Sequence, residues 1–207
     1  MEREIQRFEK EGRVPRLLLH SCCGPCSTAC MERLTEHFDV TVFYYNPNIY
    51  PEEEYLHRVA EQERLIAAFP HTHPLHFMAG EYHPEDFYSA VKGLEKEPEG
   101  GARCIRCFEL RLRATMEAAR EGGFDYFTTT LSISPLKNSE DLNRVGEALA
   151  QEMETHDLRY LVSDFKKKNG YARSCELSAE YGMYRQDYCG CVFSLRRDFV
   201  PHKNREA

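Results

Sequence analysis

Short apolar segments alternate with longer segments of helical periodicity along most of the chain. The apolar segments are rich in Val, Leu, Phe and Tyr, and they end at Gly, Pro, Asn or charged residues, a pattern typical of buried strands. They predict strands at residues 14–20, 40–45, 74–78, 124–133 and 159–163.

The segments between these strands carry helix signals. Pro25 near a first turn and the glutamates that follow Pro51 are typical helix starts, and the glycine pair at 122–123 is a typical helix end. The predicted helices cover residues 24–38, 51–69, 84–94, 102–121 and 139–154, with a charged loop at 95–101. For the second helix we expect an inner face made of Leu56, Val59, Ala60, Ile66 and Ala67. The fourth has an apolar stripe made of Ile105, Phe108, Leu112, Met116 and Ala119.

Alternating strands and helices predict an α/β fold with a mainly parallel sheet flanked by helices. We expect one domain over residues 1–207, with an N-terminal extension at 1–13, a tail at 200–207 and a Cys-containing helical C-terminal part. In such sheets, functional residues gather beyond the carboxyl ends of the strands. Three segments, at 22–26, 46–48 and 128–137, follow predicted strands in this way.

The charged N-terminus has no apolar targeting region, and no apolar run approaches the roughly 18 residues of a membrane span. We therefore expect a cytoplasmic protein without a membrane partner. Stable disulfides are rare in that reducing compartment, so the nine cysteines point to metal binding or catalysis.

Seven of the cysteines form three local groups. They are Cys22, Cys23 and Cys26; Cys104 and Cys107; and Cys189 and Cys191. Thiolates are suited to zinc, copper(I) and iron–sulfur clusters, and a helix start favours the thiolate form. Three explanations compete: a thioredoxin-like dithiol at Cys23-Gly-Pro-Cys26, a composite zinc site, and an iron–sulfur centre with a second metal nearby.

Several longer motifs resemble one known family. They are LLLHSCCGPCS, YNPNIYPEEEY, RCIRCFELRL, FTTTLSISPLKN and GYARSCELSAEYGMYRQDYCGC. Together they resemble the cobalamin-independent epoxyqueuosine reductase family over roughly residues 16–195. The resemblance implies a fold similar to nucleotide α-hydrolase (PP-loop-like) domains. It also implies reduction of epoxyqueuosine to queuosine in the tRNA anticodon loop, with a [4Fe-4S] cluster beside a mononuclear iron.

The resemblance implies roles for individual cysteines. Cys22, Cys23, Cys104 and Cys107 match the cluster ligands, and Cys189 and Cys191 match ligands of the neighbouring iron. Some members have Asp at the position of Cys26; both residue types bind iron, so Cys26 is a candidate ligand of the second site. We expect Cys30 and Cys175 to be buried or half-buried thiols.

Removing an epoxide oxygen requires two electrons and two protons, hence a redox cofactor and an external electron donor. A second iron with an open position would act as a Lewis acid on that oxygen. The candidate proton donors are His20, Asp187 and Tyr188, with His20 equally compatible with a purely structural role. ATP is not expected, because cysteines stand where a Gly-rich phosphate loop would follow the first strand.

Net charge is −7, yet residues 159–207 contain ten Lys and Arg against six Asp and Glu. That asymmetry allows a local phosphate-binding face. The candidate tRNA contacts are Lys137, Lys166, Lys167, Lys168 and Arg173. Two other functions remain open: thiol–disulfide exchange at Cys23 and Cys26, and a non-catalytic metal- or tRNA-binding module.

Overall fold

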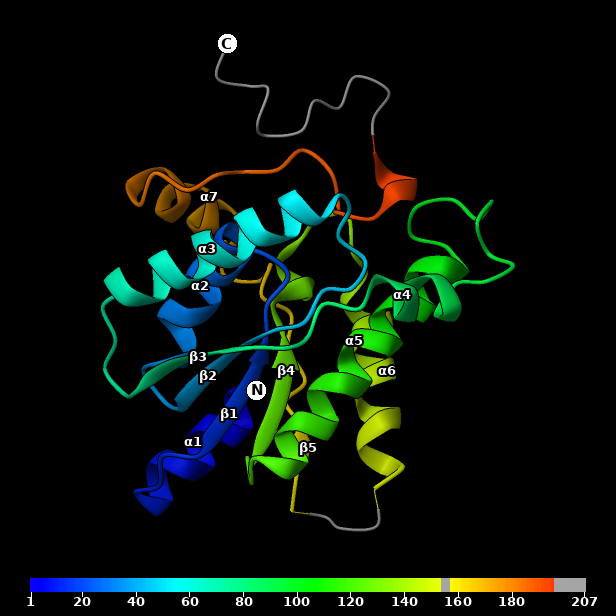
Figure 1. The fold of residues 1–207 in the computed structure, drawn as a ribbon. Coiled ribbons are helices and arrows are strands. Elements are labelled where there is room, and N and C mark those ends of the chain that lie inside the picture. The colour runs from blue at the N-terminus through cyan, green and yellow to red at the C-terminus, as the bar shows by residue number, and fades with distance from the viewer. Residues whose placement is uncertain (154–156, 196–207) are drawn as a thin grey trace.

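A five-stranded sheet, parallel throughout, forms the centre of the molecule (Figure 1). The computed structural model describes residues 1–153 and 157–195. The strand order is β3-β2-β1-β4-β5, so the chain runs outward from β1 to β3 and then returns to place β4 on the other side of β1. The strands are β1 (Arg16–His20), β2 (Asp39–Tyr44), β3 (Leu75–Ala79), β4 (Tyr126–Thr129) and β5 (Arg159–Tyr160).

Helices cover both faces of this sheet (Figure 1). Side chains alternate along β1, so Leu17 and Leu19 pack against α1, α2 and α7, whereas Leu18 packs against α5 and α6. The predicted α/β fold with a parallel sheet is confirmed. The helices are α1 (Glu2–Glu11), α2 (Gly24–Leu34), α3 (Glu52–Ala68), α4 (Pro84–Ala90), α5 (Ala102–Glu121), α6 (Ser139–Gln151) and α7 (Gly170–Glu180), with 3-10 turns η1 (Thr130–Ile133) and η2 (Val192–Ser194).

The charged N-terminal segment, expected only as an extension, forms α1 and joins the core. Ile5 and Phe8 are buried, and Phe8 meets Phe38 and Tyr126 edge-on with ring centroids 5.7 Å and 5.3 Å away. The tail expected at residues 200–207 lies outside the described residues. Among the described helices, none has both the length and the apolar character that crossing a bilayer requires.

Several predicted elements are shorter in the structure, among them β5, which ends at Tyr160, and α4, which ends at Ala90. The strand expected to reach residue 133 ends at Thr129, because the Thr129 hydroxyl accepts a hydrogen bond from the Leu131 N–H at 3.1 Å and starts η1. The helix expected to reach residue 38 ends at Leu34. The early end of β4 brings polar backbone to the carboxyl edge of the sheet, whereas α2 ends near the opposite edge, where β2 begins.

The expected inner face of α3 is only partly correct: Val59 and Ile66 are half-buried against the core, whereas Ala60 and Ala67 are exposed. Leu56 is 57% exposed, whereas Glu54, Arg58 and Gln62 are buried. The reason is the location of the helix: Glu54 to Gln62 lie over the polar carboxyl edge, and the second half of the helix, at Leu65, packs in the apolar core. Gln62 Oε1, for example, accepts hydrogen bonds from the hydroxyls of Ser21 and Ser27 at 2.7 Å and 3.0 Å.

Candidate metal centre

The loop that follows β1 meets the loop that follows β4. These strands are neighbours, yet the chain continues from one to α2 and from the other to η1, which makes their carboxyl ends a topological switch point. The Cys22 N–H donates to the Thr130 hydroxyl at 3.3 Å, and the Cys22 sulfur lies 3.6 Å from the same oxygen. The first cysteine group is therefore fixed across this point.

The sulfurs of Cys22, Cys23 and Cys26 lie within 4.8 Å of one another. Cys23 is the N-cap of α2 and makes no side-chain capping hydrogen bond, so the positive end of the helix remains available to thiolates. Hydrogen bonds from the thiols of Cys23 and Cys26 lower the pKa of Cys22 well below its usual range. The same contacts raise the pKa of Cys26, and they raise that of Cys23 to about 12. This group holds one negative charge readily, and a bound cation is needed for more.

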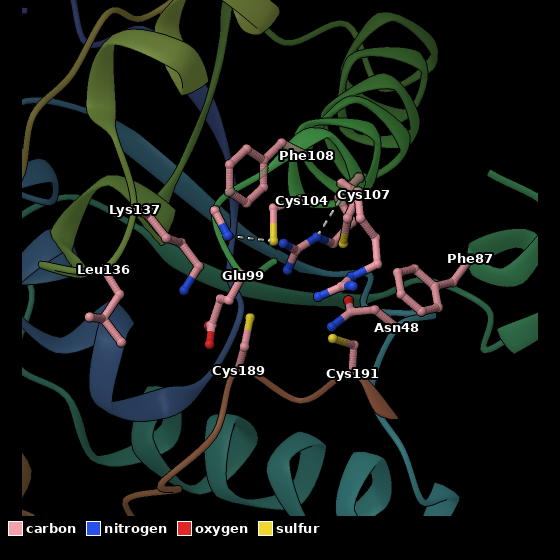
Figure 2. Close-up of a pocket in the computed structure, with 13 residues that line it drawn as sticks. Asn48, Phe87, Glu99, Cys104, Cys107, Phe108, Leu136, Lys137, Cys189 and Cys191 are labelled. Carbon is pink, nitrogen blue, oxygen red and sulfur yellow. Dashed lines mark hydrogen bonds between the residues drawn. The ribbon is translucent and has the colours of Figure 1, made fainter. Parts of the chain in front are cut away.

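The other two groups, Cys104 with Cys107 and Cys189 with Cys191, line one neighbouring pocket (Figure 2). Cys104 and Cys107 lie one turn apart at the start of α5, and the Gly100 N–H donates to the Cys104 sulfur at 3.2 Å. Cys189 and Cys191 reach the same pocket from the C-terminal segment. In Figure 2 these two side chains point toward the α5 pair from the opposite wall.

Buried contacts on α3 hold the C-terminal cysteines in place. Arg58 Nε donates to Glu54 at 2.8 Å, and the Arg58 guanidinium lies 5.1 Å from the centre of the Tyr188 ring. The Tyr188 hydroxyl donates to the Tyr50 carbonyl at 2.5 Å, and the Tyr50 N–H donates to the Gly190 carbonyl at 2.8 Å. The segment on both sides of Cys189 is thus attached to the sheet edge.

Two cations, Arg111 and Lys137, lie beside cysteines of all three groups. Arg111 is 1% exposed, donates to the Cys107 carbonyl and the Asn46 side chain at 3.3 Å and 3.2 Å, and leaves its buried Nη2 without a partner among the described residues. Burial opposes the charge on Lys137, but the thiolates of Cys189 and Cys22 outweigh it and raise the pKa of the amine. Both side chains line both cavities.

This donor set fits a buried, anionic metal centre. A cluster held by four thiolates carries net negative charge, and removing that charge from water requires nearby cations and hydrogen-bond donors. The unpartnered Nη2 of Arg111 is such a donor. Cys22 and Cys104 also pack against the same apolar group of Phe108, Leu131 and Leu142, which brings the first and second cysteine groups to one wall.

A larger cavity of about 210 Å³ opens beside the cysteines. Cys22, Cys26 and Cys189 line it, and Cys189 also lines the smaller pocket. The two spaces therefore meet at Cys189. A substrate that enters the larger cavity reaches both groups of thiols.

The three candidate proton donors have different surroundings. His20 is fully buried. Its Nε2 lies 3.1 Å from the Tyr45 carbonyl, and because a carbonyl only accepts, Nε2 carries the proton and donates. In the neutral ring Nδ1 therefore accepts from the Thr129 hydroxyl at 2.9 Å. Burial lowers the pKa of His20 to about 3, which supports its structural role. Tyr188 is buried and burial raises its pKa, whereas Asp187 is exposed at the cavity wall.

The five candidate tRNA contacts have different surroundings. Lys166 Nζ lies within the fold, where it donates to the Ser132 carbonyl at 2.8 Å and the Lys137 carbonyl at 3.3 Å. Lys168 pairs with Glu2 at 3.2 Å, and Arg173 pairs with Glu32 and Glu176. Lys137 faces the thiols, and Lys167 is exposed.

The remaining cysteines lie apart from the pockets. Cys30 is buried, with its thiol donating to the Cys26 carbonyl at 3.3 Å, and Cys175 is half-buried on α7. Sequence reasoning missed the buried cations Arg58 and Arg111. The signal available for Arg111 was its place on the inner side of a helix that begins with two cysteines, and Arg58 had no comparable signal.

The sequence is similar to one protein family along nearly its whole length. The model of the family described as "Epoxyqueuosine reductase QueH" matches residues 17–197. Relatives of that name from Staphylococcus epidermidis and Streptococcus pyogenes are 41% and 43% identical over 98% and 95% of this chain, covering 87% and 76% of their own lengths. A relative from Thermotoga maritima is 37% identical over 86% of this chain and 90% of its own.

A solved structure of phosphoadenylyl-sulfate reductase from Candida auris also matches, over 87% of this chain and 79% of that chain, at 13% identity with a TM-score of 0.43. The family match and the identities to the curated relatives extend over nearly all of the chain, including every cysteine of the candidate metal centre. The chain belongs to the epoxyqueuosine reductase QueH family.

Proposed function

We propose that this chain reduces epoxyqueuosine to queuosine within tRNA, removing the epoxide oxygen with two electrons and two protons. The observation that carries the proposal is the convergence of seven thiols, buried Arg111 and half-buried Lys137 at the switch point of the sheet, in a member of this family. Side chains alone do not supply electrons for such a step, so the thiols serve to hold a redox centre.

Cys22, Cys23, Cys104 and Cys107 would hold a [4Fe-4S] cluster, and Cys26, Cys189 and Cys191 would hold a mononuclear iron. When bound, the cluster supplies single electrons and the iron supplies Lewis acidity. Arg111 and Lys137 stabilise the charge of the thiolates, and α3 positions the C-terminal cysteines. Shortest distance alone pairs Cys26 with Cys22 and Cys23, so this division of the ligands rests on the family resemblance.

Metal content and turnover of the anaerobic protein test this proposal. We expect a brown preparation that absorbs broadly near about 400 nm, contains more than four irons per chain, and converts epoxyqueuosine in tRNA when supplied with a reductant. Fully active protein with four irons would contradict the second metal. A colourless, zinc-loaded and active protein would contradict the iron–sulfur proposal.

Asp187 is the proposed proton donor. It is exposed at the wall of the larger cavity, two residues from Cys189, whereas His20 and Tyr188 are buried in hydrogen bonds to backbone carbonyls. Loss of a positioned acid typically lowers the rate by a factor of about 10²–10⁴. Asp187→Asn should therefore reduce the single-turnover rate without changing iron or sulfide content, and an unchanged rate would exclude it.

Exposed Lys167 is the candidate we retain for contact with tRNA phosphates, because Lys166, Lys168 and Arg173 already contact protein acceptors. Binding through one phosphate contact contributes about one unit to the salt dependence. Lys167→Ala should lower the slope of log affinity against log salt by about one, and Lys96→Ala, on another loop, serves as control.

The electrons come from an external donor, and the reaction does not consume ATP. The loop sequence supports the absence of ATP from the reaction. The residues after β1 are Ser21-Cys22-Cys23, at the position where phosphate-binding loops present glycine N–H groups. We place the enzyme in the cytoplasm, where tRNA is modified. Turnover with a chemical reductant that is unchanged by added ATP is the expected result.

A further inference from the structure

One carboxylate reaches the junction of the two cavities. Glu99 belongs to the charged loop at 95–101 and is the only acidic residue that lines both spaces among the described residues. Figure 2 shows its side chain pointing into the pocket, in the region of Lys137 and Cys189. The larger cavity has one other acidic residue, Asp187, and the smaller pocket has none in the described part of the chain.

The loop that carries Glu99 is held in place. Arg103 is buried and donates to the carbonyls of Glu95, at 2.9 Å, and Glu97, while its guanidinium lies 4.7 Å from the centre of the Phe193 ring. Gly100 has a φ of +86°, in the left-handed region that favours glycine, and its N–H reaches the Cys104 sulfur. The turn at Gly100 thus joins Glu99 to the first cysteine of α5.

Two cations, Arg111 and Lys137, line the same two cavities as Glu99. Burial opposes the charge of Lys137, but nearby thiolates stabilise it and raise its pKa. No side chain among the described residues forms a hydrogen bond or an ion pair with the Glu99 carboxylate. The Glu99 carboxylate is exposed on the wall of both cavities, where a ligand that enters can pair with it. The position therefore suits a ligand that brings positive charge.

The proposed substrate has such a charge. In queuosine-type bases a secondary alkyl amine joins the 7-deazaguanine to the cyclopentane ring, and it is protonated at neutral pH. In the epoxide form the ring carbon that bears this amine is adjacent to the epoxide. A group that binds the ammonium therefore lies beside the C–O bond to be broken.

We propose that Glu99 binds the protonated secondary amine of the substrate and so places the epoxide at the junction of the two cavities. This inference rests on the proposed function and adds a specificity-determining residue to it. Guanosine lacks the amine, so Glu99 distinguishes a modified anticodon base from an unmodified one. A charge-assisted hydrogen bond of this kind is geometrically specific as well as strong.

The test compares binding of two tRNAs that differ only at this base. Queuosine-containing tRNA and the same tRNA with guanosine are titrated anaerobically against the metal-loaded wild type, Glu99→Gln and Glu95→Gln. Glu95 belongs to the same loop, is exposed and lines neither cavity, which makes its variant the matched control. We expect the wild type and Glu95→Gln to prefer queuosine, and Glu99→Gln to lose at least about tenfold of that preference.

Two further measurements separate the outcomes. Iron and sulfide content should be unchanged in Glu99→Gln, and KM for the epoxyqueuosine-containing tRNA should rise by about the same factor as the preference falls. Loss of iron would make Glu99 a metal ligand and overturn the inference, as would an unchanged preference. A wild type that converts no epoxyqueuosine would instead refute the proposed function.

Discussion

Replacing Glu54 by Gln tests whether the polar inner face of α3 positions the C-terminal cysteines. Glu54 and Arg58 are each only 2% exposed, and their contact distance is 2.8 Å. Glu54 also accepts from the Tyr184 hydroxyl at 3.1 Å. The Glu54→Gln variant keeps the shape of the side chain, removes its charge, and leaves the Arg58 cation buried without a carboxylate.

Breaking a buried ion pair on one side costs about 3–5 kcal/mol, because the remaining charge stays desolvated. The lower end, about 3 kcal/mol, applies here, since Gln retains one oxygen that accepts from Arg58 Nε. For a domain of this size each kcal/mol lowers the melting temperature by about 2–4 °C. We therefore expect a decrease of roughly 6–12 °C.

Urea unfolding under anaerobic conditions measures the change in free energy, and iron content reports the position of Cys189 and Cys191. Glu53→Gln is the matched control: Glu53 is exposed in the same helical turn and should change stability by less than about 0.5 kcal/mol. A double variant, Glu54→Leu with Arg58→Met, should recover part of the loss, because it removes both charges. Equal midpoints for Glu54→Gln and Glu53→Gln would refute the reasoning.

Three more predictions concern single residues. Cys107→Ser should lower acid-labile sulfide in anaerobic protein, whereas Cys175→Ser, outside both pockets, should not. Gly190→Ala should lower iron content, because Gly190 has a φ of +120° and an added Cβ would lie 3.0 Å from Ile49; unchanged iron would contradict this docking. Burial lowers the pKa of His20 from 6.5 to about 3, so the unfolded chain gains a proton that the folded chain does not bind. Stability should therefore fall by about 1.4 kcal/mol per pH unit below pH 6.5, and urea titrations of His20→Asn should lack that contribution.

The fold was predictable where burial follows one simple pattern. The strands of the sheet read as apolar segments because helices cover both faces, and α5 was placed correctly from its apolar stripe. The inner face of α3 was not predictable in this way. That helix buries Glu54, Arg58 and Gln62 because it covers the sheet edge that carries the site, where polar groups find partners.

The sequence groups seven cysteines by their short spacings, and the structure brings these groups to neighbouring pockets. Their arrangement was not predictable. Sequence separation gave no distance between Cys22 and Cys104, which meet only through the strand order β1-β4 and the packing of Phe108. The loop around Glu99 carried no recognisable signal by itself, since charged residues with Pro and Gly usually indicate a solvated turn.

The tetrapeptide Cys23-Gly-Pro-Cys26 occurs in dithiol oxidoreductases, but its surroundings here favour metal binding. Thiol exchange needs an accessible sulfur of lowered pKa. Cys23 is 1% exposed, and its hydrogen bond to Cys22 raises its pKa to about 12. The thiolate of the group is Cys22, outside the tetrapeptide, with two S–H donors close by. A metal cation that binds all three sulfurs must displace two protons, so metal uptake by the apoprotein should acidify a weakly buffered solution. Disulfide exchange would not require Cys22, and Cys22→Ser therefore distinguishes the two chemistries: it should weaken metal uptake and the proton release that accompanies it, whereas a dithiol enzyme would keep its reductase activity.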